Sequence, residues 1–222
     1  MDRLIFFDIN GTIIKRDDKT DIPYELAIDK YLQVENGMNG VDTSARSDKD
    51  VFHEVLRKYD QQFSEEKWKE FLKIYEEYLE EYADSDIWQA NVDIVEFLEK
   101  ISTTNCALAI ISGELRMGAR YKLSKIGVWE YFIDGGFGED GLERKDIAFT
   151  ALDRIEKKLN KKFEKIIVIG DTIKDIKIAR LFKAKIVSIA TGSNTYEELK
   201  EYNPDFLVRK FEEIDLDKLL SE

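Results

Sequence analysis

The alternation of short apolar runs with amphipathic segments constrains the fold of this chain more than any other feature. From residue 91 onward, strand-like runs at residues 106–112, 131–137, 165–171 and 185–191 are separated by segments with apolar residues three or four positions apart. These segments predict helices over residues 92–101, 114–127, 145–160, 173–183 and 195–202. Apolar strands separated by helices predict an α/β fold with a Rossmann-like parallel sheet and helices on both faces.

A block without strand character interrupts this alternation near the N-terminus. Residues 3–8 have strand character, and this strand must join the sheet because a buried lone strand cannot satisfy its backbone groups. Residues 24–34, 47–59 and 64–82 have the spacing of amphipathic helices. The sequence therefore predicts an α/β core domain made of residues 1–15 and 90–222, with an all-α domain inserted at residues 16–89.

The charge balance limits the partners of the protein. The 222 residues include 46 acidic and 34 basic side chains, and the resulting net charge of −12 would repel a polyphosphate backbone. We therefore expect neither nucleic acid nor an anionic membrane as a partner. The single cysteine, Cys106, excludes an internal disulfide, and no stretch is typical of a secretion signal or a membrane span. A cytoplasmic location is expected.

Polar side chains cluster where the predicted strands end. They are Asp8, Ser112, Arg144, Lys145, Asp171 and Asp175. Because ligands of open α/β sheets bind at the carboxyl ends of the strands, these side chains predict one common site. Three carboxylates gathered there would repel one another unless a divalent cation lay among them, and carboxylates with a carbonyl and waters suit Mg²⁺.

Four segments resemble the motifs of the haloacid dehalogenase superfamily, and within it the phosphatases typified by phosphoglycolate phosphatase and β-phosphoglucomutase. In chain order they are FFDINGT, IISG, ERKD and IGDTIKD. The resemblance covers essentially the whole chain, and the helical insertion resembles the small α-helical cap of these enzymes. It implies a Mg²⁺-dependent phosphatase that acts on a small phosphorylated metabolite, with the cap closing over the site.

The resemblance also implies catalytic roles. Asp8 would attack the phosphoryl group and form an aspartyl phosphate, which water later hydrolyses. Ser112 and one basic residue would neutralise the phosphoryl oxygens that are not transferred. Lys145 is preferred as that basic residue, with Arg144 as the second choice.

Metal and substrate ligands follow from the same resemblance. The carboxylate of Asp8, the backbone carbonyl of Asn10 and Asp171 would hold Mg²⁺, with Asp175 in support. Residues 45–48, ARSD, resemble a cap segment that contacts substrate, although a purely structural role is equally compatible with them. The expected substrate-binding residues are Thr12, Gly113, Arg46 and Asp48.

Position 10 departs from the phosphatase pattern DxDGT. The second acid of that pattern transfers protons to the leaving group and from water, and Asn10 can do neither. The sequence therefore predicts a slow hydrolase, or one that accumulates the phosphoenzyme. Two explanations compete: an engineered substitution that traps a substrate complex, which we prefer because every other catalytic element is present, and a natural residue with altered chemistry.

Two other functions are compatible with the sequence. A dehalogenase would use the same nucleophile without a metal, but the acidic pair Asp171 and Asp175 favours a metal. A non-catalytic protein that binds phosphate or has a regulatory role is the second alternative, and Asn10 is the best argument for it.

Overall fold

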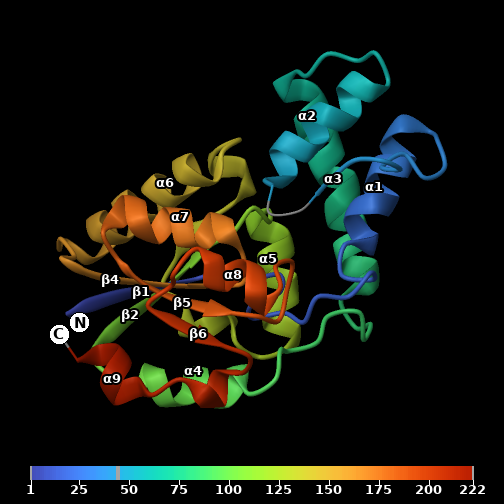
Figure 1. Ribbon diagram of the computed structural model, residues 1–222. Coiled ribbons are helices and arrows are strands. Elements are labelled where there is room, and N and C mark those ends of the chain that lie inside the picture. The colour runs from blue at the N-terminus through green and yellow to red at the C-terminus, as the bar shows by residue number, and fades with distance from the viewer. Residues whose placement is uncertain (1, 44–45, 222) are drawn as a thin grey trace.

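The structure, a computed structural model, describes residues 2–43 and 46–221. Within these residues a six-stranded parallel sheet has the order β3-β2-β1-β4-β5-β6 (Figure 1). The strands are β1 Arg3–Phe7, β2 Cys106–Ile111, β3 Gly135–Gly136, β4 Lys165–Gly170, β5 Lys185–Ile189 and β6 Phe206–Val208. The predicted α/β class and parallel sheet are confirmed, and the N-terminal strand lies at the centre of the sheet.

Helices cover both faces of the sheet (Figure 1). One face packs against α6 Arg144–Leu159, α7 Ile173–Phe182 and α8 Tyr196–Glu201, and the other against α4 Ile94–Ser102, α5 Arg116–Lys125 and α9 Leu216–Leu220. Side chains of a strand alternate between its two faces. Accordingly Leu4 and Phe6 of β1 belong to the apolar cluster beneath α6, α7 and α8, whereas Ile5 and Phe7 belong to the cluster on the other face, beneath α4, α5 and α9.

Three N-terminal helices gather beside the sheet rather than over either face (Figure 1). They are α1 Ile22–Leu32, α2 Asp48–Lys58 and α3 Glu65–Tyr82. Their apolar sides form a separate cluster rich in aromatic rings, in which Phe52 stacks on Phe71 with ring centroids 4.6 Å apart. In the ranges 2–43 and 46–221, no helix combines the length and the apolar character that crossing a membrane requires.

The strand at the β3 edge is shorter than expected. The sequence predicts a strand over residues 131–137, but only Gly135 and Gly136 form it, between a 3₁₀ turn at Trp129–Tyr131 and another at Gly138–Asp140. A Cβ atom on Gly136 would lie 2.3 Å from the carbonyl oxygen of Ile147. Glycine therefore lets α6 pack directly on the backbone of this strand, and the two 3₁₀ turns limit its length.

Candidate active site

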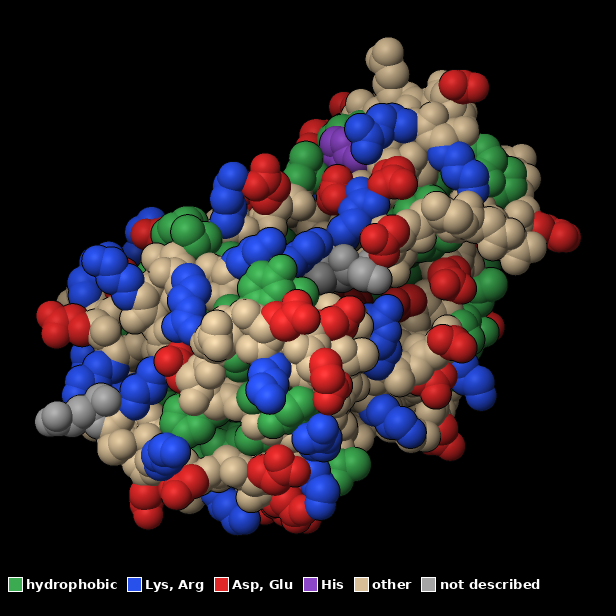
Figure 2. Space-filling view, in the orientation of Figure 1, with side chains coloured by type: hydrophobic (Ala, Val, Ile, Leu, Met, Phe, Trp, Pro, Cys, Tyr) green, Lys and Arg blue, Asp and Glu red, His purple; other side chains and the backbone are tan. Residues whose placement is uncertain are grey.

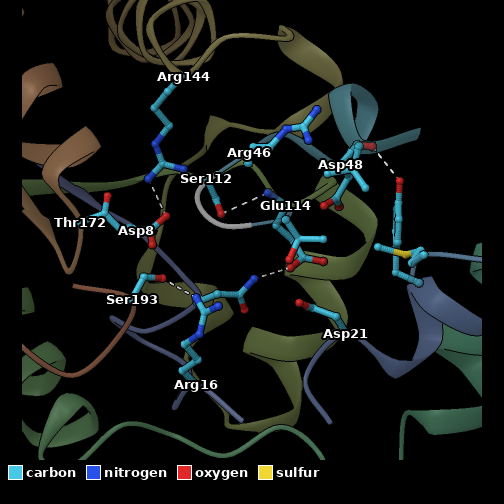
Figure 3. A pocket seen from close by; sticks show the side chains of 16 residues that line it. Asp8, Arg16, Asp21, Arg46, Asp48, Ser112, Glu114, Arg144, Thr172 and Ser193 are labelled. Atoms are coloured by element: carbon cyan, nitrogen blue, oxygen red, sulfur yellow. Dashed lines mark hydrogen bonds and ion pairs between the residues drawn. The ribbon is translucent and has the colours of Figure 1, made fainter. Parts of the chain in front are cut away.

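The carboxyl ends of three neighbouring strands bring distant parts of the chain together. Asp8 follows β1, Ser112 follows β2 and Asp171 follows β4, and these strands are adjacent in the sheet. A cavity opens here between the sheet and the α1–α3 helices (Figure 3). Its wall includes Asp8, Asn10, Ser112 and Arg144 on the sheet side and Asp21, Tyr24 and Asp48 on the helical side.

Three buried carboxylates form the centre of this site. Asp8, Asp171 and Asp175 each offer an oxygen that lies within 4.8 Å of the others. Burial raises the pKa of Asp8 from its ordinary value of 3.8 to about 6, with Arg144 opposing this rise and Asp175 adding to it. Burial, followed by the charges of Asp8 and Asp175, also raises the pKa of Asp171 well above its ordinary value. The positive charge near these carboxylates is therefore too small to offset their burial and mutual repulsion.

Local hydrogen bonds hold Asp171 in place. Thr12 Oγ1 donates to Asp171 Oδ1 over 3.0 Å, and the backbone N–H of Ser193 donates to Asp171 Oδ2 over 2.8 Å. Gly11 has a φ of +92°, and a Cβ there would lie 2.6 Å from Asp171 Oδ2. The turn after β1 therefore needs glycine both for its backbone conformation and for space beside this carboxylate.

Asp175 is fixed by the start of its own helix. Thr172, at the N-cap of α7, donates to Asp175 Oδ2 through its backbone N–H over 3.1 Å and through Oγ1 over 2.6 Å. The capping box thereby directs the other oxygen, Oδ1, toward the guanidinium of Arg144, 2.7 Å away.

Arg144 places a positive charge against two of these carboxylates. Its Nη2 donates to Asp8 Oδ1 over 2.5 Å, and the side chain is only 9% exposed (Figure 3). Burial alone would lower the pKa of Arg144, but its ion pairs with Asp8 and Asp175 raise it above the ordinary value. Its Nε is buried and has no hydrogen-bond partner within residues 2–43 and 46–221, so this donor is free to bind a ligand.

Of the two predicted basic residues, the structure places Arg144 and not Lys145 at the cavity. The side chain of Lys145 is 53% exposed, pairs with Glu143 and is absent from the cavity wall, which Arg144 joins instead. Adjacent residues of a helix point about 100° apart, so one residue of the pair faces the site and the other faces solvent.

The predicted substrate-binding residues near the strands occupy different positions. Gly113 lines the cavity beside Ser112, whose Oγ accepts from the backbone N–H of Glu114 over 3.3 Å (Figure 3). Thr12 is fully buried, lies outside the cavity wall and bonds to Asp171. In this structure Thr12 therefore supports a carboxylate of the site.

The segment ARSD lies at the start of α2, although its first residue, Ala45, is outside the described residues. Arg46 lines the cavity, but its guanidinium is already paired with Asp50 and Glu54. Asp48 also lines the cavity and accepts a hydrogen bond from the backbone N–H of Leu115 over 2.8 Å. Both predicted ligands are therefore near the site and already hold protein partners.

A polar network around Asn10 was not predicted from the sequence. Asn10 Nδ2 donates to Glu114 Oε2 over 2.9 Å, and Tyr75 donates to the other oxygen of Glu114. Lys122 Nζ lies 2.5 Å from Glu114 Oε2 and 3.1 Å from Asp21 Oδ1. Burial alone would lower the pKa of Lys122, but Glu114 and Asp21 raise it. Asn10 thus faces a buried ion pair.

The chain is similar to known hydrolases in sequence. Residues 3–183 match the family model of haloacid dehalogenase-like hydrolases. A curated protein from Caldanaerobacter subterraneus subsp. tengcongensis, named "Putative pyrophosphatase PpaX", is 27% identical over 204 residues, which are 92% of this chain and 89% of that protein.

Two solved structures share the fold. A hydrolase from Pseudomonas syringae has a TM-score of 0.71 at 19% identity, over 100% of both chains. A structure described as a predicted phosphoglycolate phosphatase from Haemophilus somnus 129pt has a TM-score of 0.63 at 18% identity, over 94% of both chains.

Proposed function

Because the chain belongs to the haloacid dehalogenase-like hydrolase family, we propose that it is a metal-dependent phosphatase of a small phosphorylated metabolite, with Asp8 as the nucleophile. One observation carries the proposal: Asp8 ends the central strand, bonds to Arg144 and shares a buried cluster with Asp171 and Asp175. A nucleophile and a fixed cation in one cavity, with a carboxylate cluster that adjoins it through Asp8, are the parts that phosphoryl transfer requires.

The donor set fits a magnesium ion. Asp8 and Asp175 share the guanidinium of Arg144, so a divalent cation would offset the remaining negative charge of the three buried carboxylates, and oxygen ligands are those that Mg²⁺ prefers. Asp8, Asp171 and the backbone carbonyl of Asn10 would hold the ion, with Asp175 in support. When bound, it would supply positive charge against the phosphoryl oxygens.

The side chains of the cavity account for the transfer itself. A carboxylate oxygen of Asp8 forms a bond to phosphorus while the bond from phosphorus to the leaving oxygen breaks, and the leaving group then takes a proton. Arg144 and Ser112 would neutralise the phosphoryl oxygens that are not transferred, and the unpartnered Nε of Arg144 supports this role. Water then attacks phosphorus, the bond between phosphorus and the Asp8 oxygen breaks, inorganic phosphate leaves as the product, and the proton of the water passes to solvent.

Asn10 is expected to make turnover slow or to let phosphoenzyme accumulate, because an amide cannot take part in proton transfer. Loss of general acid and base help typically costs a factor of about 10² to 10⁴ in rate. The amide of Asn10 is held on both sides, because its Nδ2 donates to Glu114 and its Oδ1 accepts from Lys122 Nζ over 3.4 Å.

We extend the proposal to the domain organisation. Residues 16–89 would form a cap over a core made of residues 1–15 and 90–222, and closure would exclude water from the transfer. The separate apolar cluster of α1–α3 and the position of these helices across the cavity from Asp8 support this division.

Mass spectrometry of the intact protein tests the nucleophile. After incubation with acetyl phosphate and Mg²⁺, we expect one phosphoryl adduct that maps to Asp8 and is absent from Asp8→Asn. An unmodified wild-type protein that also fails to hydrolyse phosphate monoesters would refute the proposal. A following screen should include phosphoglycolate, sugar phosphates, nucleotides and pyrophosphate, because one relative is named as a pyrophosphatase.

Two other functions would give different results. A phosphate-binding or regulatory protein, which Asn10 favours, would bind inorganic phosphate but form no adduct. A dehalogenase would act on a haloacid without metal, and the cluster of Asp8, Asp171 and Asp175 argues against it.

A further inference from the structure

Asp48, at the start of α2, both donates a hydrogen bond to the loop after β2 and accepts one from it. The backbone N–H of Asp48 donates to the carbonyl of Gly113 over 2.8 Å. The carboxylate of the same residue accepts from the backbone N–H of Leu115 through Oδ2, also over 2.8 Å. Asp48 therefore spans residues 113–115, which follow directly on Ser112.

Two glycines allow the backbones to meet this closely. A Cβ on Gly113 would lie 2.0 Å from the carbonyl oxygen of Arg46, and a Cβ on Gly138 would lie 2.1 Å from the carbonyl oxygen of Gly113. These distances leave no room for a side chain at either position. Apart from the Asp48 carboxylate, the backbones of the two segments thus lie against each other directly.

Further bonds fix the same helix start. Tyr24 of α1 donates its hydroxyl to the carbonyl of Asp48 over 2.7 Å, and Ser47 Oγ donates to the carbonyl of Leu142 over 3.3 Å. Asp48 itself is half-buried and lies at the first position of the helix. Burial, and next the charge of Glu114, raise the pKa of Asp48 well above its ordinary value.

The loop held by Asp48 carries two groups of the site. Ser112 and Glu114 are joined by the bond from the N–H of Glu114 to Ser112 Oγ, and Glu114 accepts from Asn10. The N–H of Leu115 and the carbonyl of Gly113 flank Glu114, so a displacement of α2 would move both groups relative to Asp8.

We propose that Asp48 is a positioning residue that clamps α2 to the loop 112–115, and that it acts on the reaction through this loop rather than by binding substrate. This inference rests on the proposed phosphatase function for its effect on rate, but the clamp itself does not depend on activity. It replaces the expectation of a substrate-binding carboxylate at this position.

Substitutions at one position separate the two roles. Asp48→Asn keeps an acceptor for the N–H of Leu115, so we expect kcat and KM within about twofold of wild type, whereas Asp48→Ala should lower kcat/KM for p-nitrophenyl phosphate about tenfold or more. Asp60→Asn, which removes an exposed acid just after α2, is the control and should change neither parameter. If Asp48→Asn loses as much activity as Asp48→Ala, the charge matters and the proposal is overturned.

Hydrogen exchange tests the clamp without any turnover. In Asp48→Ala the amide of Leu115 should exchange about tenfold faster or more, while amides of β1 and β4 keep their wild-type rates. Asp48→Asn should restore the slow exchange and also guards against a folding defect in the alanine variant. Unchanged exchange at Leu115 in Asp48→Ala would refute the clamp, whereas a wild-type protein without turnover would bear only on the proposed phosphatase function.

Discussion

The side-chain amide of Asn10 donates to the carboxylate of Glu114 over 2.9 Å, and Lys122 Nζ lies 2.5 Å from the same oxygen. An ionised aspartate at position 10 would place a second carboxylate against Glu114, with one buried ammonium to serve both. We therefore expect Asn10→Asp to lower the free energy of unfolding by about 1 to 3 kcal/mol. Urea denaturation at neutral pH measures this change.

Substitution of Glu114 tests whether this carboxylate causes the loss of stability in Asn10→Asp. Glu114→Gln introduced into Asn10→Asp removes one of the facing charges, so the double variant should recover stability relative to the sum of the single effects. In the double-mutant cycle of Asn10→Asp and Glu114→Gln, a coupling energy of about 1 kcal/mol or more would show that residue 10 depends on Glu114. Additive effects would mean that the identity of residue 10 is independent of Glu114.

The neighbours Arg144 and Lys145 should differ sharply in function. Arg144 bonds to both Asp8 and Asp175, so Arg144→Gln removes the fixed cation and should lower kcat about 10²- to 10³-fold. Lys145→Gln removes the same charge one position along and should leave kcat within about twofold, because this side chain pairs with Glu143 in solvent. Steady-state hydrolysis of p-nitrophenyl phosphate measures both, and equal losses would contradict the assignment.

In the absence of metal, the ionisation of Asp8 should make the free energy of unfolding depend on pH. Its pKa is raised to about 6 from 3.8, mainly by burial, so the folded state holds a proton more tightly than the unfolded state. The stability that this proton contributes is present below about pH 4 and is lost as the pH rises through about 6. At pH 7.5 without metal, Asp8→Asn should therefore raise the free energy of unfolding by about 2 to 3 kcal/mol.

The same comparison at low pH provides the check. Near pH 3.5 Asp8 is protonated in the folded state, so the advantage of Asp8→Asn should nearly vanish. Thermal unfolding in the presence of a chelator gives both values. An advantage that is independent of pH would mean that ionisation of Asp8 is not its source.

Sequence patterns predicted the sheet and the positions of Asp8, Ser112 and Asp171, because strand ends in a parallel sheet share one edge. The choice between Arg144 and Lys145 depended on helix phase. Arg144 lies three, four, seven and eleven residues before buried positions of α6, which places it on the sheet-facing side, whereas the exposed Phe149 lies four residues after Lys145. The phase of the apolar residues therefore indicated which of the two side chains faces the cavity.

The network around Lys122 was less accessible to prediction. Lys122 lies three residues after the buried Ala119 and beside the buried Leu123, so its burial on α5 was indicated by the helical pattern. Its partners Asp21 and Glu114 belong to other segments, and their approach depends on how the α1–α3 helices dock on the core. No local pattern in one sequence specifies such docking.

The space beside Asp171 offers a separate test of the metal ligands. A Cβ on Gly192 would lie 1.9 Å from Asp171 Oδ2, the oxygen that also accepts from the N–H of Ser193. Gly192→Ala should therefore displace this carboxylate and weaken Mg²⁺ binding about tenfold or more. Isothermal titration with Mg²⁺ measures the affinity.

Gly127→Ala is the control, because it strains the backbone without placing an atom near a carboxylate. A Cβ there meets no atom within 4 Å, but the φ of +74° strains any other residue. This variant should lose about 1 kcal/mol of stability and keep its Mg²⁺ affinity, because the strain is backbone strain far along the chain from the carboxylates. If Gly192→Ala and Gly127→Ala bind Mg²⁺ equally well, Asp171 does not hold the ion, since only the first substitution intrudes on its oxygen.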